Sequence, residues 1–252
     1  MSLHEVRYFS QALQKATSSF VIYPDKNVPG PYHCMLLLHG LSDDHSIWQR
    51  RTSIERYVAD KPLIVVMPDG GRGFYVDALQ GFQYLQAIAY ELPDLLDHWF
   101  DIKGKWCTAG LSMGGYGAFR IALERPELFR SAVSHSGAVT IGRYYPNEEI
   151  ETGRHSQDAF IREFIPVFGK VTPGGKDDLV ELAKNASPLP ALRFDCGTED
   201  FLLDSNRSLQ QEFTEFGIDH EYQEFSGDHN WEYWDLHIQE AIAFNLRNLS
   251  GE

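Results

Sequence analysis

The feature that most constrains this chain is a serine flanked by glycines in the segment GLSMG, residues 110–114. An apolar, β-prone stretch precedes it at 106–109, and residues 118–123 follow with helical spacing. This pattern predicts a strand, a tight turn and a helix, with Ser112 in a strained backbone conformation at the turn. The flanking glycines are then required, because a side chain at either position would collide with the turn. Free N–H groups at the start of the helix would face the serine, where an oxyanion would form.

Further apolar runs predict a sheet with several buried strands. Buried strands are expected at 34–39, 63–67, 106–111, 131–135 and 192–196, and a continuous apolar run such as that at 34–39 is typical of a parallel strand covered on both faces. Other strands are expected at 5–10, 15–23 and 221–225, and helices at 46–60, 83–100, 204–216 and 231–247. This alternation predicts an α/β fold, a mostly parallel twisted sheet with helices on both faces.

The segment at about 138–190 interrupts the alternation as an insertion between strands. It either overhangs a site or only packs on the fold, and the sequence favours neither interpretation. The chain has 252 residues, of which 43% are hydrophobic, and it contains no internal repeat or evident linker. We therefore expect a single domain spanning residues 1–252.

The overall charge and the cysteines limit the partners and the compartment. A net charge of −14 argues against binding to nucleic acid or to anionic lipid surfaces. No stretch has the length of a membrane span, and the first residues lack the apolar core of a signal peptide. Cys34, Cys107 and Cys196 lie in apolar runs without metal-ligand spacing, which predicts buried reduced thiols and a cytoplasmic location. Assembly into a homo-oligomer stays open.

A serine nucleophile needs a base within hydrogen-bond reach, and the base needs an orienting carboxylate. The loops after parallel strands gather at one edge of the sheet, so we expect both partners directly after strands that follow Ser112. Asp200 and Glu199 follow the strand at 192–196, and Asp228 and His229 follow the last strand. His229 is the candidate base. Asp200 is in the expected place for the acid, with Glu199 and Asp228 as rivals.

A tetrahedral intermediate also needs two aimed N–H donors. One is expected from the backbone of Met113, the residue after the nucleophile. The other is expected from the loop after the strand at 34–39, where Leu41 N–H is the candidate and Gly40 leaves it approachable. The alternative for this loop is a plain strand-ending turn.

Other polar and aromatic residues have simpler interpretations. His135 follows a strand but precedes the acid in the sequence, so we expect a structural or pocket-lining histidine. The run of Asp43, Asp44 and His45 suggests a cation site, but a solvated loop is favoured, and no metal is expected. Four aromatic residues either line an acyl or alcohol pocket or belong to the core, and core is the commoner outcome. They are Trp48, Tyr75, Tyr144 and Trp231.

Seven segments together carry a resemblance to a known family: LLHG at 37–40, VMPDGG at 66–71, ELP at 91–93, GLSMGGYG at 110–117, SHSG at 134–137, CGTED at 196–200 and GDH at 227–229. In these segments the chain resembles the esterase D family of α/β-hydrolases, which includes S-formylglutathione hydrolases and tributyrin-type and feruloyl-type esterases. The resemblance covers about residues 18–245. The segment RRTSIERY at 50–57 is most similar to the short-chain tributyrin esterase branch. Residues 138–170 depart from the family pattern, so the substrate stays open.

The resemblance implies a carboxylesterase with the α/β-hydrolase fold, and no metal or organic cofactor is expected. It implies the following roles: Ser112 as nucleophile, Asp200 as acid, His229 as base, and Leu41 and Met113 as oxyanion donors. The expected reaction is hydrolysis of small-molecule, short-chain acyl esters through an acyl-serine intermediate. Three alternatives stay open: cleavage of the thioester S-formylglutathione, acyl transfer to an alcohol, and a catalytically silent hydrolase fold that serves as a binding module.

Overall fold

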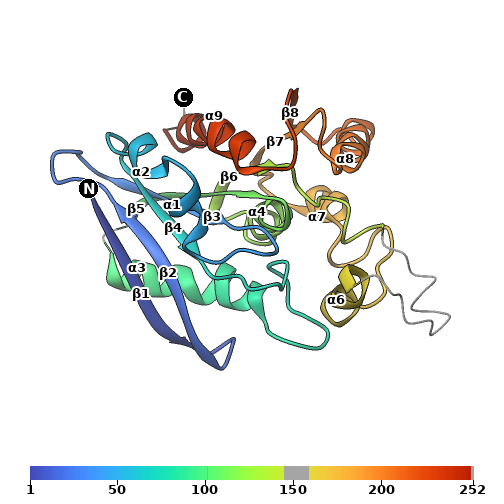
Figure 1. Cartoon of the computed structure of the whole chain (residues 1–252), viewed down its shortest axis with the longest axis horizontal. Coiled ribbons are helices and arrows are strands. Elements are labelled where there is room, and N and C mark those ends of the chain that lie inside the picture. Colours follow the sequence, from blue (N-terminus) through green and yellow to red (C-terminus); the bar gives the residue numbers. More distant parts are fainter. Residues whose placement is uncertain (101, 145–158, 251–252) are drawn as a thin grey trace.

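The computed structural model describes residues 1–100, 102–144 and 159–250, and its strands form one eight-stranded sheet in the order β1-β2-β4-β3-β5-β6-β7-β8. The strands are β1 (Ser2–Ser10), β2 (Lys15–Tyr23), β3 (Tyr32–Leu38), β4 (Leu63–Pro68), β5 (Ile102–Leu111), β6 (Phe129–His135), β7 (Ala191–Gly197) and β8 (Glu221–Phe225). The β1–β2 and β2–β4 pairs are antiparallel, and the pairs from β4–β3 to β7–β8 are parallel. The predicted mostly parallel sheet is therefore confirmed, with the antiparallel pair at one end and β8 at the other (Figure 1).

Helices cover both faces of this sheet, as the sequence predicts (Figure 1). They are α1 (Ile47–Arg51), α2 (Ile54–Tyr57), the π-helix η1 (Gln86–Glu91), α3 (Leu92–Trp99), α4 (Met113–Glu124), α6 (Ala159–Phe168), α7 (Leu179–Asn185), α8 (Leu203–Glu215) and α9 (Trp231–Ser250). One core is formed with buried side chains of α3, α4, α6, α7 and α8, and the other with those of α1, α2 and α9. None of the helices in the described residues is long and apolar enough to cross a bilayer. The three cysteines are buried and free, as predicted.

The helix expected over 46–60 is interrupted in the structure. Thr52 is extended, with φ −130° and ψ 172°, and separates α1 from α2. Its hydroxyl donates to the Trp48 carbonyl at 2.5 Å and accepts from the Ile54 N–H at 3.2 Å. The carboxylate of Asp235 in α9 accepts from the Ser53 N–H at 2.8 Å. These bonds satisfy the backbone at the break, which a continuous helical pattern in the sequence does not indicate.

The described part of the insertion packs on the nucleophile side of the fold. Phe164 and Phe168 of α6 contact Phe74, with ring centroids 4.7 and 5.4 Å apart. Tyr116 of α4 donates a hydrogen bond to the carbonyl of Asp177 at 2.9 Å. Residues 145–158 of the insertion lie outside the described residues.

Asn245 fixes α9 to the centre of the sheet. Its side chain is fully buried, accepts from the Ser131 hydroxyl at 2.7 Å and donates to the Thr108 carbonyl at 3.2 Å. Since α9 begins at Trp231, two residues after His229, this anchor also limits how far the preceding loop can shift.

We predict that Asn245→Leu lowers the free energy of unfolding by about 1–3 kcal/mol, because the Ser131 hydroxyl and the Thr108 carbonyl lose their buried partner. Urea unfolding followed by circular dichroism measures the loss. Asn248→Leu is the matched control, since that half-buried side chain donates only to the Phe244 carbonyl of its own helix. Equal stability of the two variants would contradict an anchoring role for Asn245.

Candidate active site

Ser112 occupies the predicted sharp turn between β5 and α4, with φ 52° and ψ −117°. The glycine requirement at this turn is confirmed by the packing. A Cβ at Gly110 would lie 2.3 Å from the Gly114 carbonyl oxygen, and a Cβ at Gly114 would lie 2.4 Å from that of Leu38. The turn therefore sits directly against the end of β3, and only glycine allows this approach.

Three side chains from separate strand ends meet in one hydrogen-bonded row. The Nε2 atom of His229 lies 3.1 Å from the Ser112 hydroxyl oxygen, and its Nδ1 lies 2.9 Å from Oδ2 of Asp200. The other carboxylate oxygen of Asp200 accepts from the Leu202 N–H at 2.8 Å. The structure thus brings together the three residues that the sequence suggests for nucleophile, base and acid, and it does so through the shared edge of the parallel strands.

The surroundings of Asp200 keep its carboxylate ionised. Burial alone would raise the pKa of Asp200, but hydrogen bonds from the His229 ring, the Leu202 N–H and the Ser136 side chain outweigh it and lower the pKa. An ionised carboxylate only accepts, so the proton on the His229 ring belongs on Nδ1. Nε2 is then a free acceptor facing the Ser112 hydroxyl.

Glu199 and Asp228, the two other candidates for the acid, bond to the backbone and not to the His229 ring. Glu199 accepts from the Gly227 N–H at 2.5 Å, and Asp228 accepts from the backbone N–H of His229 at 2.7 Å. Both carboxylates thus support the loop that carries His229, whereas the carboxylate bonded to its ring is that of Asp200.

Two backbone N–H groups beside Ser112 are unpaired. Among the hydrogen bonds of the described residues, none has Leu41 N–H or Met113 N–H as its donor. Both residues line the same cavity as Ser112 and His229. A negatively charged oxygen bound near Ser112 is the kind of group that such free donors stabilise.

This cavity has a volume of about 790 Å³. Of the four aromatic candidates, Tyr144 and Trp231 line it, whereas Trp48 and Tyr75 are almost fully buried in the core. Three lining aromatics were missed, namely Phe74, Phe201 and Trp234. Phe201 could have been found from its place directly after Asp200. Thr140 and Ile141 also line the cavity, so the described start of the insertion both packs on the fold and borders the site.

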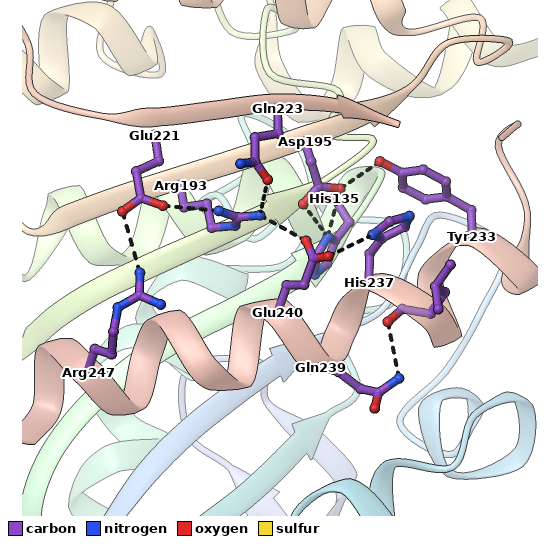
Figure 2. Close-up of polar contacts among 11 residues, drawn as sticks. His135, Arg193, Asp195, Glu221, Gln223, Tyr233, His237, Gln239, Glu240 and Arg247 are labelled. Carbon is purple, nitrogen blue, oxygen red and sulfur yellow. Dashed lines mark hydrogen bonds and ion pairs between the residues drawn. The ribbon is translucent and has the colours of Figure 1, made fainter. Parts of the chain in front are cut away.

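His135 belongs to a separate buried network (Figure 2) and is absent from the cavity wall. Its Nδ1 lies 2.9 Å from Oδ2 of Asp195, and the Tyr233 hydroxyl donates to Oδ1 of Asp195 at 2.9 Å. On the same face of β7, Arg193 pairs with Glu240 of α9 at 2.9 Å (Figure 2). His135 is therefore a structural histidine, one of the two roles expected for it. No pattern in the sequence indicates its partners.

The acidic run after β3 forms no metal cluster. Asp44 accepts from both the N–H and the hydroxyl of Ser46. Burial raises the pKa of Asp43, which lies in the cavity wall. Within the described ranges, no group of three or more His, Cys, Asp or Glu side chains is arranged to hold a metal ion.

Comparisons with known proteins show similarity to esterases over most of the chain. A family model described as "Putative esterase" matches residues 10–244. The acetyl esterase of Caldicellulosiruptor saccharolyticus is 25% identical over 260 residues, which cover 97% of this chain and 98% of that protein.

Two solved structures are also similar over nearly the whole chain. The substrate-bound Staphylococcus aureus fluorophosphonate-binding serine hydrolase FphF has a TM-score of 0.84 at 26% identity, covering 97% of this chain and 98% of that one. The S-formylglutathione hydrolase FrmB from Staphylococcus aureus has a TM-score of 0.81 at 27% identity, covering 98% of this chain and 100% of that one.

Proposed function

This chain belongs to the Esterase family of α/β-hydrolases, and from that premise we propose that it hydrolyses short-chain carboxylic esters through an acyl-serine intermediate on Ser112. The observation that carries the proposal is the His229 ring, bonded on one side to the Ser112 hydroxyl at 3.1 Å and on the other to Asp200 at 2.9 Å. A base held between a hydroxyl and a buried carboxylate is the arrangement that activates a serine.

In the proposed reaction, His229 Nε2 accepts the Ser112 proton while the serine oxygen attacks the ester carbonyl. The N–H groups of Leu41 and Met113 stabilise the tetrahedral oxyanion. The protonated ring then donates its proton to the leaving alcohol, and the acyl group stays on Ser112. Water, deprotonated by the same ring, releases the acid. Asp200 keeps the ring in the Nδ1–H form and stabilises its positive charge.

The proposed preference for a short acyl group is supported by similarity to esterases that are named for short acyl groups. The Caldicellulosiruptor relative is named an acetyl esterase, and residues 50–57 resemble the tributyrin esterase branch. We also propose that the chain acts as one α/β-hydrolase domain, supported by strands from both ends of the chain in one sheet. Three free buried thiols support a cytoplasmic location.

Replacement of the nucleophile tests the reaction. Ser112→Ala is expected to lower kcat for p-nitrophenyl butyrate by about a million-fold, because only the oxyanion site and substrate binding remain. Labelling by a fluorophosphonate should be lost as well. Thermal unfolding of the variant controls for misfolding. Near-normal turnover by a folded variant would end the assignment of Ser112.

Substitution of Asp200 tests its assignment as the acid. Asp200→Asn is expected to lower kcat by about 10⁴-fold, because an amide in place of the carboxylate favours the wrong tautomer of the ring. Asp228→Asn is the matched control, since its side-chain oxygen still accepts from the His229 N–H and kcat should change by only a few-fold. The reverse order of effects would make Asp228 the acid.

The likeness to FrmB favours thioester cleavage as a second candidate. The two functions are separated by kcat/KM for S-formylglutathione and for p-nitrophenyl butyrate, measured on the same preparation. We expect the ester to be the better substrate. A kcat/KM for S-formylglutathione at least ten times higher would replace the ester proposal with thioester hydrolysis.

A further inference from the structure

The loop that follows β3 has an unusual set of partners for its backbone. Four successive carbonyl oxygens each accept a hydrogen bond from a side chain. Leu38 accepts from Trp48 Nε1 at 3.0 Å, His39 from the Tyr75 hydroxyl at 3.1 Å, Gly40 from His39 Nδ1 at 2.7 Å and Leu41 from Arg72 Nη1 at 3.1 Å. Loop carbonyls on a protein surface usually bond to water. Here the carbonyls of residues 38–41 are instead held by side chains of the protein.

The partners of His39 define its tautomer. The N–H of Gly70 donates to Nε2 at 2.9 Å, so Nε2 carries no proton. The Gly40 carbonyl can only accept, so the proton is on Nδ1. The carboxylate of Asp69 lies 3.8 Å from Nε2, beyond hydrogen-bond distance, and instead accepts from the Gly71 N–H at 2.9 Å. His39, 1% exposed, thus bridges two loops.

The bond from His39 to Gly40 acts on the peptide that also carries Leu41 N–H. A planar trans peptide directs its C=O and N–H in opposite directions, and the cis bonds among the described residues lie elsewhere, before Pro31 and Pro188. Holding the Gly40 carbonyl toward the buried imidazole therefore turns Leu41 N–H away from it. Leu41 lines the cavity, and a Cβ on Gly40 would lie 3.8 Å from Ser112 Cβ.

The hydrogen bond from His39 restrains a peptide that is next to a glycine, Gly40. A Cβ at this position would lie 2.8 Å from the end of the Leu111 side chain, so this packing favours glycine. Glycine also leaves the adjacent peptide free to rotate. The Asp43 N–H contributes a second, longer bond to the Gly40 carbonyl, at 3.3 Å. The short bond from His39 is the stronger of the two.

We propose that His39 is a positioning residue for ester hydrolysis: it fixes the 40–41 peptide so that Leu41 N–H is directed at the oxyanion. This inference rests on the proposed function, in which that N–H stabilises the tetrahedral intermediate. His39 itself transfers no proton and does not touch the substrate. A histidine suits this position directly after β3, because its one ring supplies both a donor for the Gly40 carbonyl and an acceptor for the Gly70 N–H.

Two substitutions separate positioning from simple packing. The amide nitrogen of asparagine reaches the place of Nδ1, so His39→Asn retains a donor for the Gly40 carbonyl. The amide of glutamine reaches the place of Nε2, so His39→Gln retains an acceptor for the Gly70 N–H but loses that donor. Both remove one buried bond, and both are expected to lower the thermal unfolding temperature by similar amounts.

The turnover of p-nitrophenyl butyrate is measured per active site, with sites counted by stoichiometric fluorophosphonate labelling. We expect kcat to fall about 10- to 100-fold in His39→Gln, since complete loss of an oxyanion donor costs about 100- to 1,000-fold. The loss in His39→Asn should be at least fivefold smaller. KM and the pH profile of kcat should match those of the wild type in both, because the row of Ser112, His229 and Asp200 is intact.

Tyr75→Phe provides the matched control. It removes the bond to the His39 carbonyl, which belongs to the 39–40 peptide and not to the 40–41 peptide that carries Leu41 N–H. Stability should therefore fall, while kcat should fall less than in His39→Gln. The proposal is overturned if the two His39 variants have the same kcat per labelled site, or if Tyr75→Phe loses as much. A wild-type protein that hydrolyses no ester or is not labelled at Ser112 would instead refute the proposed function.

Discussion

The arrangement of the site depends on one close packing contact, that of the turn around Ser112 against the end of β3. The turn holds Ser112 at φ 52°, and Gly114 lies so near the Leu38 carbonyl that a Cβ would come within 2.4 Å of it. The same contact places the N-terminus of α4 beside the loop with Leu41. Ser112, the proposed nucleophile, and both candidate oxyanion donors are therefore positioned by the neighbouring strands β3 and β5.

The proposed base and acid follow strands that lie between β5 and the β8 edge of the sheet. Asp200 follows β7 and His229 follows β8, while α9 packs mainly on β5 and β6 and is fixed there by Asn245 in the core. Tyr233, four residues after His229, reaches the buried Asp195 (Figure 2). The loop with His229 is thus held from both sides, by Glu199 at Gly227 and by the first turn of α9.

The sequence was sufficient for features that depend on local pattern. The buried strands, the sharp turn and the residues at strand ends follow from apolar runs and glycine spacing, which indicate Ser112, His229 and three candidate acids. The choice of Asp200 among these acids came from the family resemblance. Features that depend on distant partners were not predictable. The break after Arg51 is supported by Asp235, 182 positions from Ser53, and Asp195 pairs with a histidine 60 positions away. Apolar periodicity carries no information about such polar pairs.

Three buried or half-buried histidines show why residue type alone does not define the role. His229 and His39 both carry their proton on Nδ1, and both accept at Nε2. For His229 the partner is a hydroxyl, which can give up its proton, and the ring lies in the cavity wall. For His39 the partner is the backbone N–H of Gly70, which does not give up its proton, so the ring serves only as a hydrogen-bonded bridge. His135 has a carboxylate partner as His229 does, but its Nε2 is buried without a partner among the described residues. A histidine bonded to a carboxylate is therefore insufficient for catalysis. The other ring nitrogen must also face a group that can transfer its proton, and the ring must border a cavity that admits a substrate.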